Sequence, residues 1–193
     1  MNLLREYVRG LLTEAAKRPE DLPADWMVYV DNMRDEYRIE LAGDGRTVGS
    51  ITIGPAGTDV VPCLGSYQVN TSQAEQGWGP MLYDVAMEIA SMYSSGLIAD
   101  RSAVSDEAQK VWHFYQDNRS DVEVAQLDDL YNTLTPDEYD NCLQQVAWWD
   151  VGLDDEAGDE FTRSPLSKLY GVYGTPTIDR LKALGKIEFE ESR

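Results

Sequence analysis

The first half of the chain alternates short apolar segments with turn residues, a pattern typical of antiparallel strands. Polar and apolar residues alternate along Tyr37–Ala42, and Gly43-Asp44-Gly45 forms a hairpin turn into the next segment. Apolar and β-branched runs bounded by Pro and Gly predict further strands. The four predicted strands are Trp26–Asp31, Tyr37–Ala42, Thr47–Gly54 and Val60–Val69.

Helical periodicity replaces this alternation further along the chain. The apolar residues of Met81–Ala90 recur at the spacing of a buried helical face, and Gly96 ends that helix. Leu97–Asp100 then predicts a short central strand. The connection through the helix is long enough for this strand to pair in parallel with the fourth one. Ser105 is the expected N-cap of a second helix.

Both ends of the chain carry weaker helical patterns. Leu4, Val8 and Leu11 form one apolar stripe, which predicts an amphipathic helix over Leu3–Lys17. Beyond Asn118 the periodicity weakens. The elements predicted there are a helix at Pro136–Trp148, an acidic loop at Val151–Asp159 and a short helix at Thr177–Leu184.

Together these elements predict an α+β fold, with a mixed, mostly antiparallel central sheet flanked by helices. The predicted organisation has three parts. They are an N-terminal amphipathic helix (residues 1–18), a core (residues 24–125) and an acidic C-terminal extension packed on the core (residues 126–193).

Charge narrows the classes of partner. The 193 residues include 35 acidic and 16 basic side chains, for a formal net charge of −19. Thirteen of the acids, and no Lys or Arg, lie between Asp121 and Glu160. Such a surface repels nucleic acid and anionic membranes, and favours cationic partners or simple solvation.

No stretch approaches the roughly 18 apolar residues of a membrane span, and charged residues interrupt any signal-peptide core. We therefore expect a soluble, cytoplasmic protein.

Reactive side chains are few. Cys63 and Cys142 form no metal-binding pattern and have no basic neighbour, so we expect free, buried thiols in a reducing compartment. The single histidine, His113, excludes a multi-histidine metal site and is expected at the surface or partly packed. The stretch Asp150–Glu160 lacks the spacing of a calcium-binding loop, so no metal site is predicted.

The stretch Gln76-Gly77-Trp78-Gly79-Pro80 stands directly before the helix that begins near Met81. One interpretation is steric: a tight turn that needs positive φ, with Pro80 at the first helical position. The other is chemical: an anion site, because the N–H groups and the dipole of a helix N-terminus point outward there. The residues alone leave both interpretations open.

The order of strand, glycine turn, helix, short strand and capped helix resembles the core of the GNAT N-acyltransferase superfamily, over about residues 37–118. In that family the turn reads Arg/Gln-x-x-Gly-x-Gly/Ala, and its backbone amides hold the pyrophosphate of an acyl-coenzyme A. Gly77 and Gly79 match the two glycines, and Met81–Ala90 matches the helix behind them. A second family signature, Asn-x-x-Ala-x-x-Leu-Tyr, is echoed by Ser105, Ala108, Val111 and Trp112.

The resemblance implies acetyl-CoA or another acyl-CoA as co-substrate, and an amine of a small molecule or protein as acceptor. The implied coenzyme-binding residues are Gln68, Val69, Gln76, Gly77, Trp78, Gly79, Met81 and Ser105. A backbone N–H near the end of the fourth strand would polarise the thioester carbonyl, and Tyr67 and Asn70 would order a water. Tyr115 is the candidate acid for the departing thiolate; the alternative is a core or edge aromatic residue.

The chain also departs from the family pattern. Ala74 stands where the family has Arg or Gln, and Trp112 stands where its tyrosine often lies. No pair of helices separates the first two strands. These departures leave a second function open, a catalytically inactive GNAT-like binding or structural protein. The dense acids leave a third, an acidic mimic of nucleic acid. The sequence does not indicate an oligomeric state.

Met1–Ala15 is similar to the N-terminal helices of some proteins of large tailed phages. Leu12-Thr13-Glu14-Ala15 matches the Leu-x-Glu pattern that a phage head protease cleaves before a small residue. This similarity implies a phage protein of the host cytoplasm or the virion. An amphipathic helix docked on the domain explains the same residues.

Overall fold

The structure is a computed structural model, and it describes residues 16–56, 61–75, 77–101, 103–130, 133–143 and 159–191. The helices are α2 (Gly79–Tyr93), α3 (Asp106–Asn118), α4 (Asp159–Arg163) and α5 (Pro176–Ala183), with short 3-10 helices η1 (Pro19–Asp21), η2 (Cys63–Gly65) and η3 (Pro165–Ser167). The strands are β1 (Met27–Asn32), β2 (Tyr37–Gly43), β3 (Arg46–Pro55), β4 (Tyr67–Ala74), β5 (Leu97–Ile98), β6 (Val122–Gln126), β7 (Asp128–Asp129), β8 (Asn141–Cys142), β9 (Lys168–Val172) and β10 (Ile187–Glu191).

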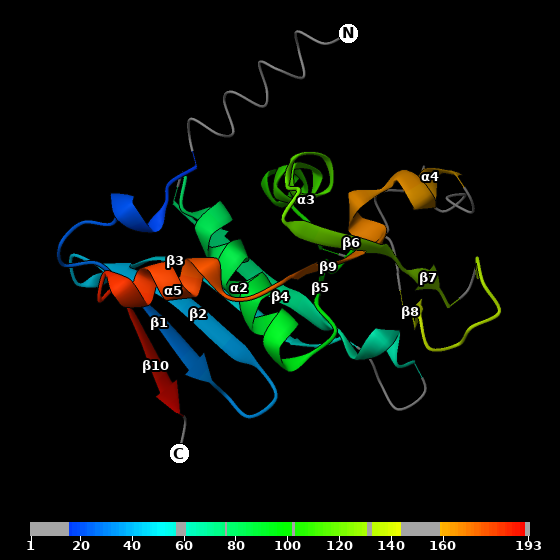
Figure 1. The fold of residues 1–193 in the computed structure, drawn as a ribbon, viewed down its shortest axis with the longest axis horizontal. Coiled ribbons are helices and arrows are strands. Elements are labelled where there is room, and N and C mark those ends of the chain that lie inside the picture. The colour runs from blue at the N-terminus through cyan, green and yellow to red at the C-terminus, as the bar shows by residue number, and fades with distance from the viewer. Residues whose placement is uncertain are drawn as a thin grey trace, which may run out of the picture. The chain divides into compact units, whose positions relative to one another are not determined.

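In the described part of the chain, eight strands form one sheet in the order β10-β1-β2-β3-β4-β5-β9-β6, and β7 pairs with β8 separately (Figure 1). β1 runs parallel to β10 and antiparallel to β2. β4 runs parallel to β5, as the sequence predicts, and β9 is antiparallel to both β5 and β6. The α+β class and the mixed, mostly antiparallel sheet are therefore confirmed.

The chain divides into two compact units, and each is described by itself. The described part of the first unit lies within residues 16–52, 71–86 and 175–191, and the second lies within residues 53–70 and 87–174. Strands β3 and β4 and helix α2 contribute residues to both units.

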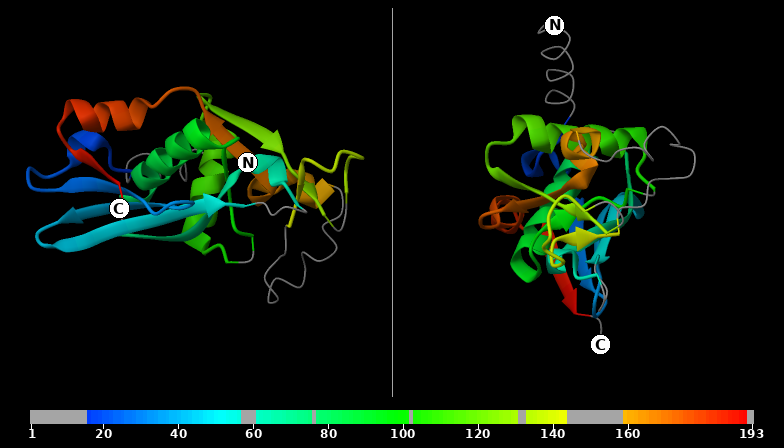
Figure 2. Two further views of the ribbon diagram at one scale, coloured as in Figure 1. Left: turned by 90° about the horizontal axis from the view of Figure 1, so that it is seen from below. Right: turned by 90° about the vertical axis from the view of Figure 1, so that its right-hand side faces the viewer.

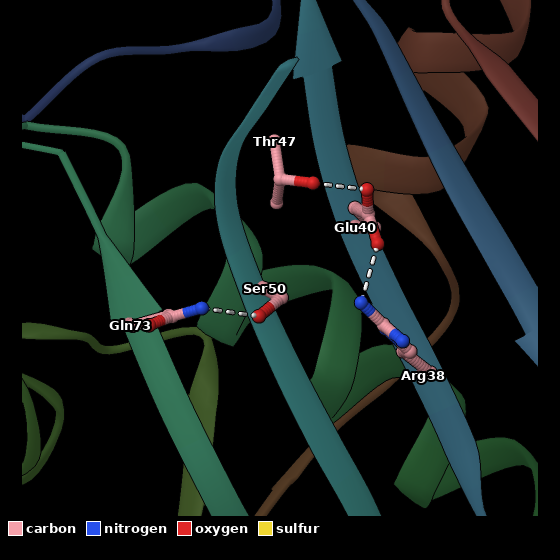
Figure 3. A network of polar contacts seen from close by, with 5 residues as sticks. All are labelled: Arg38, Glu40, Thr47, Ser50 and Gln73. Atoms are coloured by element: carbon pink, nitrogen blue, oxygen red, sulfur yellow. Dashed lines mark hydrogen bonds and ion pairs between the residues drawn. The ribbon is translucent and has the colours of Figure 1, made fainter.

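In the first unit, period-two alternation separates a buried face of the sheet from a polar one. Ile39 and Leu41 of β2 are fully buried, and so are Val28 and Val30 of β1. The polar face carries short hydrogen-bond networks, shown in Figure 3. Its contacts are Arg38 Nη2 to Glu40 Oε2 at 2.8 Å, Thr47 Oγ1 to Glu40 Oε1 at 2.5 Å, and Gln73 Nε2 to Ser50 Oγ at 3.4 Å.

The C-terminal segment is fixed to the first unit by Lys186. Its ammonium donates to the carbonyl oxygens of Pro23 and Ala24, both at 2.6 Å, and of Trp26 at 3.1 Å. Beyond it, β10 pairs with β1 from Val28–Ile187 onward. β10 therefore forms one edge of the sheet.

In the second unit, an aromatic cluster lies in the core. Trp112 and Tyr115 of α3 pack against Tyr170 of β9, with Trp112 and Tyr170 ring centroids 4.9 Å apart. The Tyr170 hydroxyl donates to the Pro165 carbonyl at 2.6 Å, which satisfies its polar end. Figure 2 shows β9 (orange), the strand that contributes Tyr170 to this cluster, beside β6 (yellow-green).

Cys63 and Cys142 form a disulfide, so the expectation of free thiols is wrong. Their Cα atoms lie 4.5 Å apart although 79 residues separate them in the sequence. Both are buried in a small apolar cluster with Ile98, Leu127 and Leu169. The fold makes this pair by bringing η2 against β8, and no spacing in the sequence encodes that contact.

Two predicted elements differ from those observed. The fourth strand is Tyr67–Ala74 rather than Val60–Val69, because Leu64 and Gly65 adopt positive φ (+56° and +65°) and break the apolar run into a 3-10 turn. Residues 136–143 contain bends and β8 instead of a helix, and residues 144–148 lie outside the described residues.

The remaining predictions fall into three groups. The helix at Thr177–Leu184 is confirmed as α5, and α2 and α3 lie where the periodicity placed them. The sequence does not predict β6, β9 or β10, and the last two place residues 168–172 and 187–191 of the expected C-terminal extension in the sheet itself. The N-terminal helix up to residue 15 and the acidic loop of residues 151–158 lie outside the described residues.

Removal of the disulfide should destabilise the protein. The bond restricts a long loop of the unfolded chain, which corresponds to about 2 to 4.5 kcal/mol of unfolding free energy. We expect Cys63→Ala/Cys142→Ala to unfold at lower urea concentration than wild type. A reductant should lower the stability of wild type and leave the double variant unchanged. Equal stability of wild type and the double variant in the absence of reductant would contradict the pairing.

Asp128 is buried and organises the loop between β7 and β8. Three backbone N–H groups donate to its carboxylate, from Asp129 (2.8 Å), Leu134 (2.5 Å) and Thr135 (2.6 Å). Burial raises the pKa of this carboxyl, but the three hydrogen bonds outweigh burial, and the net pKa lies below the ordinary 3.8. These amides hold a loop where the sequence predicts the start of a helix.

The depressed pKa gives a signed pH dependence. The ionised Asp128 carboxylate stabilises the fold above the unfolded-state pKa, and this stabilisation is lost as pH falls through the lower folded-state pKa. Asp128→Asn should therefore cost about 1 to 3 kcal/mol at pH 7 and much less near pH 2. Urea unfolding at both pH values measures the difference, with the exposed Asp25→Asn as control. A constant difference would contradict this role.

Candidate functional site

The glycine turn forms a defined start for α2. Gly77 has φ of +90°, and its carbonyl accepts the backbone N–H of Lys17 at 2.9 Å. The N–H of Trp78 donates to the Glu75 carbonyl at 3.1 Å. Gly77 thus meets the steric requirement of a left-handed residue, which a side chain would oppose. The amide of Trp78, one of the predicted coenzyme contacts, already has an acceptor in this turn.

Gly79 has a different environment from Gly77. Its φ is not in the left-handed region, and a Cβ there would meet only the Cβ of Ala74, at 4.0 Å. Neither backbone strain nor crowding therefore requires glycine at this position. The space beside the first helical residue is open, as an approaching ligand would need.

The N-terminus of α2 also lacks the acidic residues that usually neutralise a helix dipole. Its first turn contains no Asp or Glu, although the chain has 35 of them. Gly79 and Met81 lie in this turn, where backbone N–H groups have no acceptor within the helix. Pro80 has no N–H to offer. The first turn of α2 therefore carries no side-chain charge that would repel an anion.

Helix α3 begins in the opposite way. The Ser105 hydroxyl accepts the N–H of Ala108 at 3.2 Å, and Asp106 and Glu107 occupy the first turn. This confirms Ser105 as an N-cap. The Ser105 hydroxyl already accepts a hydrogen bond from the helix, and the acidic side chains of Asp106 and Glu107 repel an anionic ligand.

The indole of Trp78 lies inside the first unit, with 2% of its surface exposed. It packs against Trp26, with ring centroids 5.6 Å apart, and the Lys17 ammonium lies 4.7 Å from its ring centroid. Gly43 is required beneath Trp26, because a Cβ there would lie 2.1 Å from Trp26 Cδ1. The two indoles thus pack against each other inside the first unit.

The strand residues of the predicted site lie in the second unit. Tyr67 and Gln68 pair with Leu97 and Ile98, the two residue pairs that join β4 to β5. The Tyr67 N–H donates to the Gly96 carbonyl at 2.9 Å. Beyond this pairing, Val69 is buried and Asn70 is exposed. β4 therefore continues past the end of its partner.

Tyr115, the candidate acid, is 1% exposed. Its ring lies 6.3 Å from that of Trp112 and 6.2 Å from that of Tyr170, with the Arg119 guanidinium 5.4 Å away. This is the environment expected of the core alternative. His113 on the same helix is exposed, in agreement with the sequence.

The structure therefore divides the predicted site residues between the units. Gly77, Trp78, Gly79 and Met81 lie in the first; Tyr67, Gln68, Val69, Asn70, Ser105 and Tyr115 lie in the second. Gln76 lies outside the described residues.

Three notable residues were missed by the sequence reasoning. Glu88 of α2 is 2% exposed, and its position seven residues after Met81, on the apolar face, was an available signal. Lys168 is 8% exposed; its ammonium donates to Gln126 Oε1 and the Thr162 carbonyl, and burial lowers its pKa. Lys17 contacts the glycine turn, which no local pattern indicates.

Over the described residues, no helix has both the length and the apolar character needed to cross a membrane. The same residues contain no group of three His, Cys, Asp or Glu side chains arranged to hold a metal ion. Comparison with known proteins gives no match to a family model, to a curated protein or to a solved structure.

The packing of Trp26 against Gly43 can be tested by substitution of Gly43. Gly43→Ala forces a methyl group into the Trp26 ring, so we expect a loss of about 1 to 3 kcal/mol of unfolding free energy. Gly79→Ala is the matched control and should change stability by less than about 0.5 kcal/mol. Urea unfolding followed by tryptophan fluorescence measures both. Comparable stability of Gly43→Ala and wild type would rule out this packing.

Proposed function

We propose that the protein is a GNAT-like N-acyltransferase that moves an acyl group from acyl-CoA to an amine of a cationic acceptor. The observation that carries the proposal is the N-terminus of α2. It combines a left-handed Gly77, an open Gly79 and a first helical turn without acidic residues. A phosphate group is the ligand that such a helix end favours.

The order of elements around the turn supports the same proposal. β4 leads into α2, α2 leads into β5, and α3 follows with Ser105 as its cap. β5 is parallel to β4, as expected for a strand–helix–strand unit. This is the order on which the resemblance to the GNAT superfamily rests.

The proposed reaction needs little from side chains. The amine nitrogen attacks the thioester carbonyl carbon, a C–N bond forms, and the C–S bond breaks. The amine loses a proton and the departing thiolate gains one. A backbone N–H near Gln68–Asn70 would stabilise the oxyanion, and Tyr67 and Asn70 would order the water that accepts the proton. Tyr115 remains the proposed acid. The net charge of −19 favours a cationic acceptor.

The burial of Tyr115 favours a second candidate function. A hydroxyl on a side chain that is 1% exposed has little access to a leaving thiolate. The second candidate is a catalytically inactive GNAT-like protein, associated with a phage or virion, that uses the scaffold for binding. Such a protein would bind the same anion at the N-terminus of α2 but would not catalyse acyl transfer.

Titration with acetyl-CoA tests the proposal. Gly79→Asp places a side chain and a like charge at the helix end, so we expect calorimetry to detect no binding. Gly79→Ala fits the open space and should weaken binding less than about threefold. Absence of heat and of a thermal shift for wild type at millimolar acetyl-CoA would refute the anion site.

Turnover separates the two candidates. Wild type should release free thiol from acetyl-CoA in the presence of a polyamine or an amino sugar, and Tyr115→Phe should slow the release at least tenfold. Binding without turnover supports the inactive scaffold. If Tyr115→Phe turns over as fast as wild type, the protein is an acyltransferase but Tyr115 is not its catalytic acid.

A further inference from the structure

Residues 63–65, which form η2, make a left-handed turn shortly before β4. Cys63, Leu64 and Gly65 have φ values of +44°, +56° and +65°. Glycine adopts this conformation freely, whereas cysteine and leucine adopt it only at a cost in free energy. Two neighbouring residues of this kind persist only where the surrounding structure holds them. The contacts made by the turn therefore decide whether it keeps this conformation.

The segment of residues 139–142, which contains β8, holds this turn. The disulfide joins Cys142 to Cys63. The Leu64 N–H donates to the Tyr139 carbonyl at 2.9 Å, and the Tyr139 hydroxyl donates to the Leu64 carbonyl at 3.3 Å. One covalent bond and two hydrogen bonds thus fix the two strained residues to a segment that is distant in the sequence.

The β8 segment pairs with the rest of the fold over a short length. Its sheet consists of two residue pairs, Asp128–Asn141 and Asp129–Cys142. Tyr139 is 54% exposed, and the buried Asn141 Oδ1 accepts no hydrogen bond from the residues that the structure describes. A short pairing, an exposed contact and an unsatisfied acceptor are features of segments that open locally. The segment can therefore separate from η2 while the fold persists.

Each sulfur atom of the disulfide has a polar neighbour suited to the reduced state. The Ser66 hydroxyl, which donates to the Cys63 carbonyl at 2.8 Å, lies 3.6 Å from Cys63 Sγ. The Asp140 carbonyl oxygen lies 3.6 Å from Cys142 Sγ. A hydroxyl donates well to a thiolate, and a carbonyl accepts the S–H of a thiol, whereas a disulfide has neither charge nor S–H. These neighbours favour Cys63 as the sulfur that leaves as a thiolate.

We propose that the Cys63–Cys142 disulfide is a redox-sensitive clasp, whose reduction lets residues 63–65 leave the left-handed conformation and separates the β8 segment from η2. The reductant is a dithiol. One of its thiolates attacks Cys142 Sγ, the S–S bond breaks, and the electron pair leaves on Cys63 Sγ. The second thiolate then displaces Cys142 from the mixed disulfide. The reductant becomes a cyclic disulfide, and both cysteines become thiols with protons from the dithiol.

Hydrogen exchange of the full chain in native buffer, with and without dithiothreitol, tests the release. In the reduced protein we expect the Leu64 and Ser66 amides, which donate to the Tyr139 and Cys63 carbonyls, to exchange within about tenfold of the rate of an unstructured chain. The amides that pair β1 with β2 should stay at least about a hundredfold slower than that rate. Cys63→Ala/Cys142→Ala is the control and should match reduced wild type whether or not dithiothreitol is present.

Two results would overturn the clasp. If Leu64 and Ser66 stay protected after reduction, the disulfide is a passive cross-link. If the amides of β1 and β2 lose their protection as well, the disulfide stabilises the whole fold and does not control one segment. Thiol alkylation followed by mass spectrometry confirms that the bond is reduced in each sample.

A matched pair of glycine variants tests whether the left-handed turn is coupled to the disulfide. Gly65→Ala adds strain without crowding, since the atom nearest to the new Cβ, Tyr139 Oη, lies 3.7 Å away. Gly174, with φ of +76° and no atom within 4 Å of such a Cβ, is the control outside the clasp. Reduction relieves the strain only at residue 65. Gly65→Ala should therefore raise the equilibrium constant for reduction by dithiothreitol at least about threefold, and Gly174→Ala less than about 1.5-fold. Equal equilibrium constants for the two variants would show that the turn keeps its conformation after reduction, which would overturn the clasp.

Discussion

The burial of α2 is the constraint on which the other features depend. Val85, Ala86 and Met87 are wholly inaccessible to solvent, and so are Ile89 and Ala90, which leaves this part of the helix no exposed face. A helix buried on all sides must satisfy its terminal N–H and carbonyl groups at its ends. At the N-terminal end the chain forms a turn with a left-handed Gly77, and the first helical turn contains no acidic residue. Burial of the body and this N-terminal turn together define the candidate site.

The elements that the sequence predicts well are those with local causes. The β2–β3 hairpin follows from alternation and from Gly43-Asp44-Gly45, and α3 follows from the Ser105 cap. β4 was misplaced because an apolar run extends across Leu64, whose left-handed φ is set by its surroundings. β10 was missed although Ile187 and Phe189 alternate with glutamates, since five residues give little periodicity. Such short strands depend on their partners in the sheet.

The candidate site divides in the same way. The glycine turn at Gly77 and the start of α2 could be predicted, because spacing and residue type determine them. Lys17 could not, since its contact with Trp78 depends on how the chain returns past the turn. The Cys63–Cys142 disulfide could not be predicted for the same reason, because 79 residues separate the two cysteines in the sequence. For Tyr115, helical position allowed either a site or a core location, and only the packing of Tyr170 against it shows that its ring is buried.

The pairing of β10 with β1 also determines when the sheet of the first unit can form during protein synthesis. Lys186 contacts the Trp26 carbonyl across 160 residues, and β10 pairs with β1 just beyond it. The ribosome releases β10 after all the other strands, so until then β1 has one unpaired edge. Pairing over such a separation is slow, because the connecting chain loses entropy when it closes. The first unit therefore completes its sheet only after β10 has left the ribosome, and a nascent chain stalled before residue 187 exposes a strand edge to other chains.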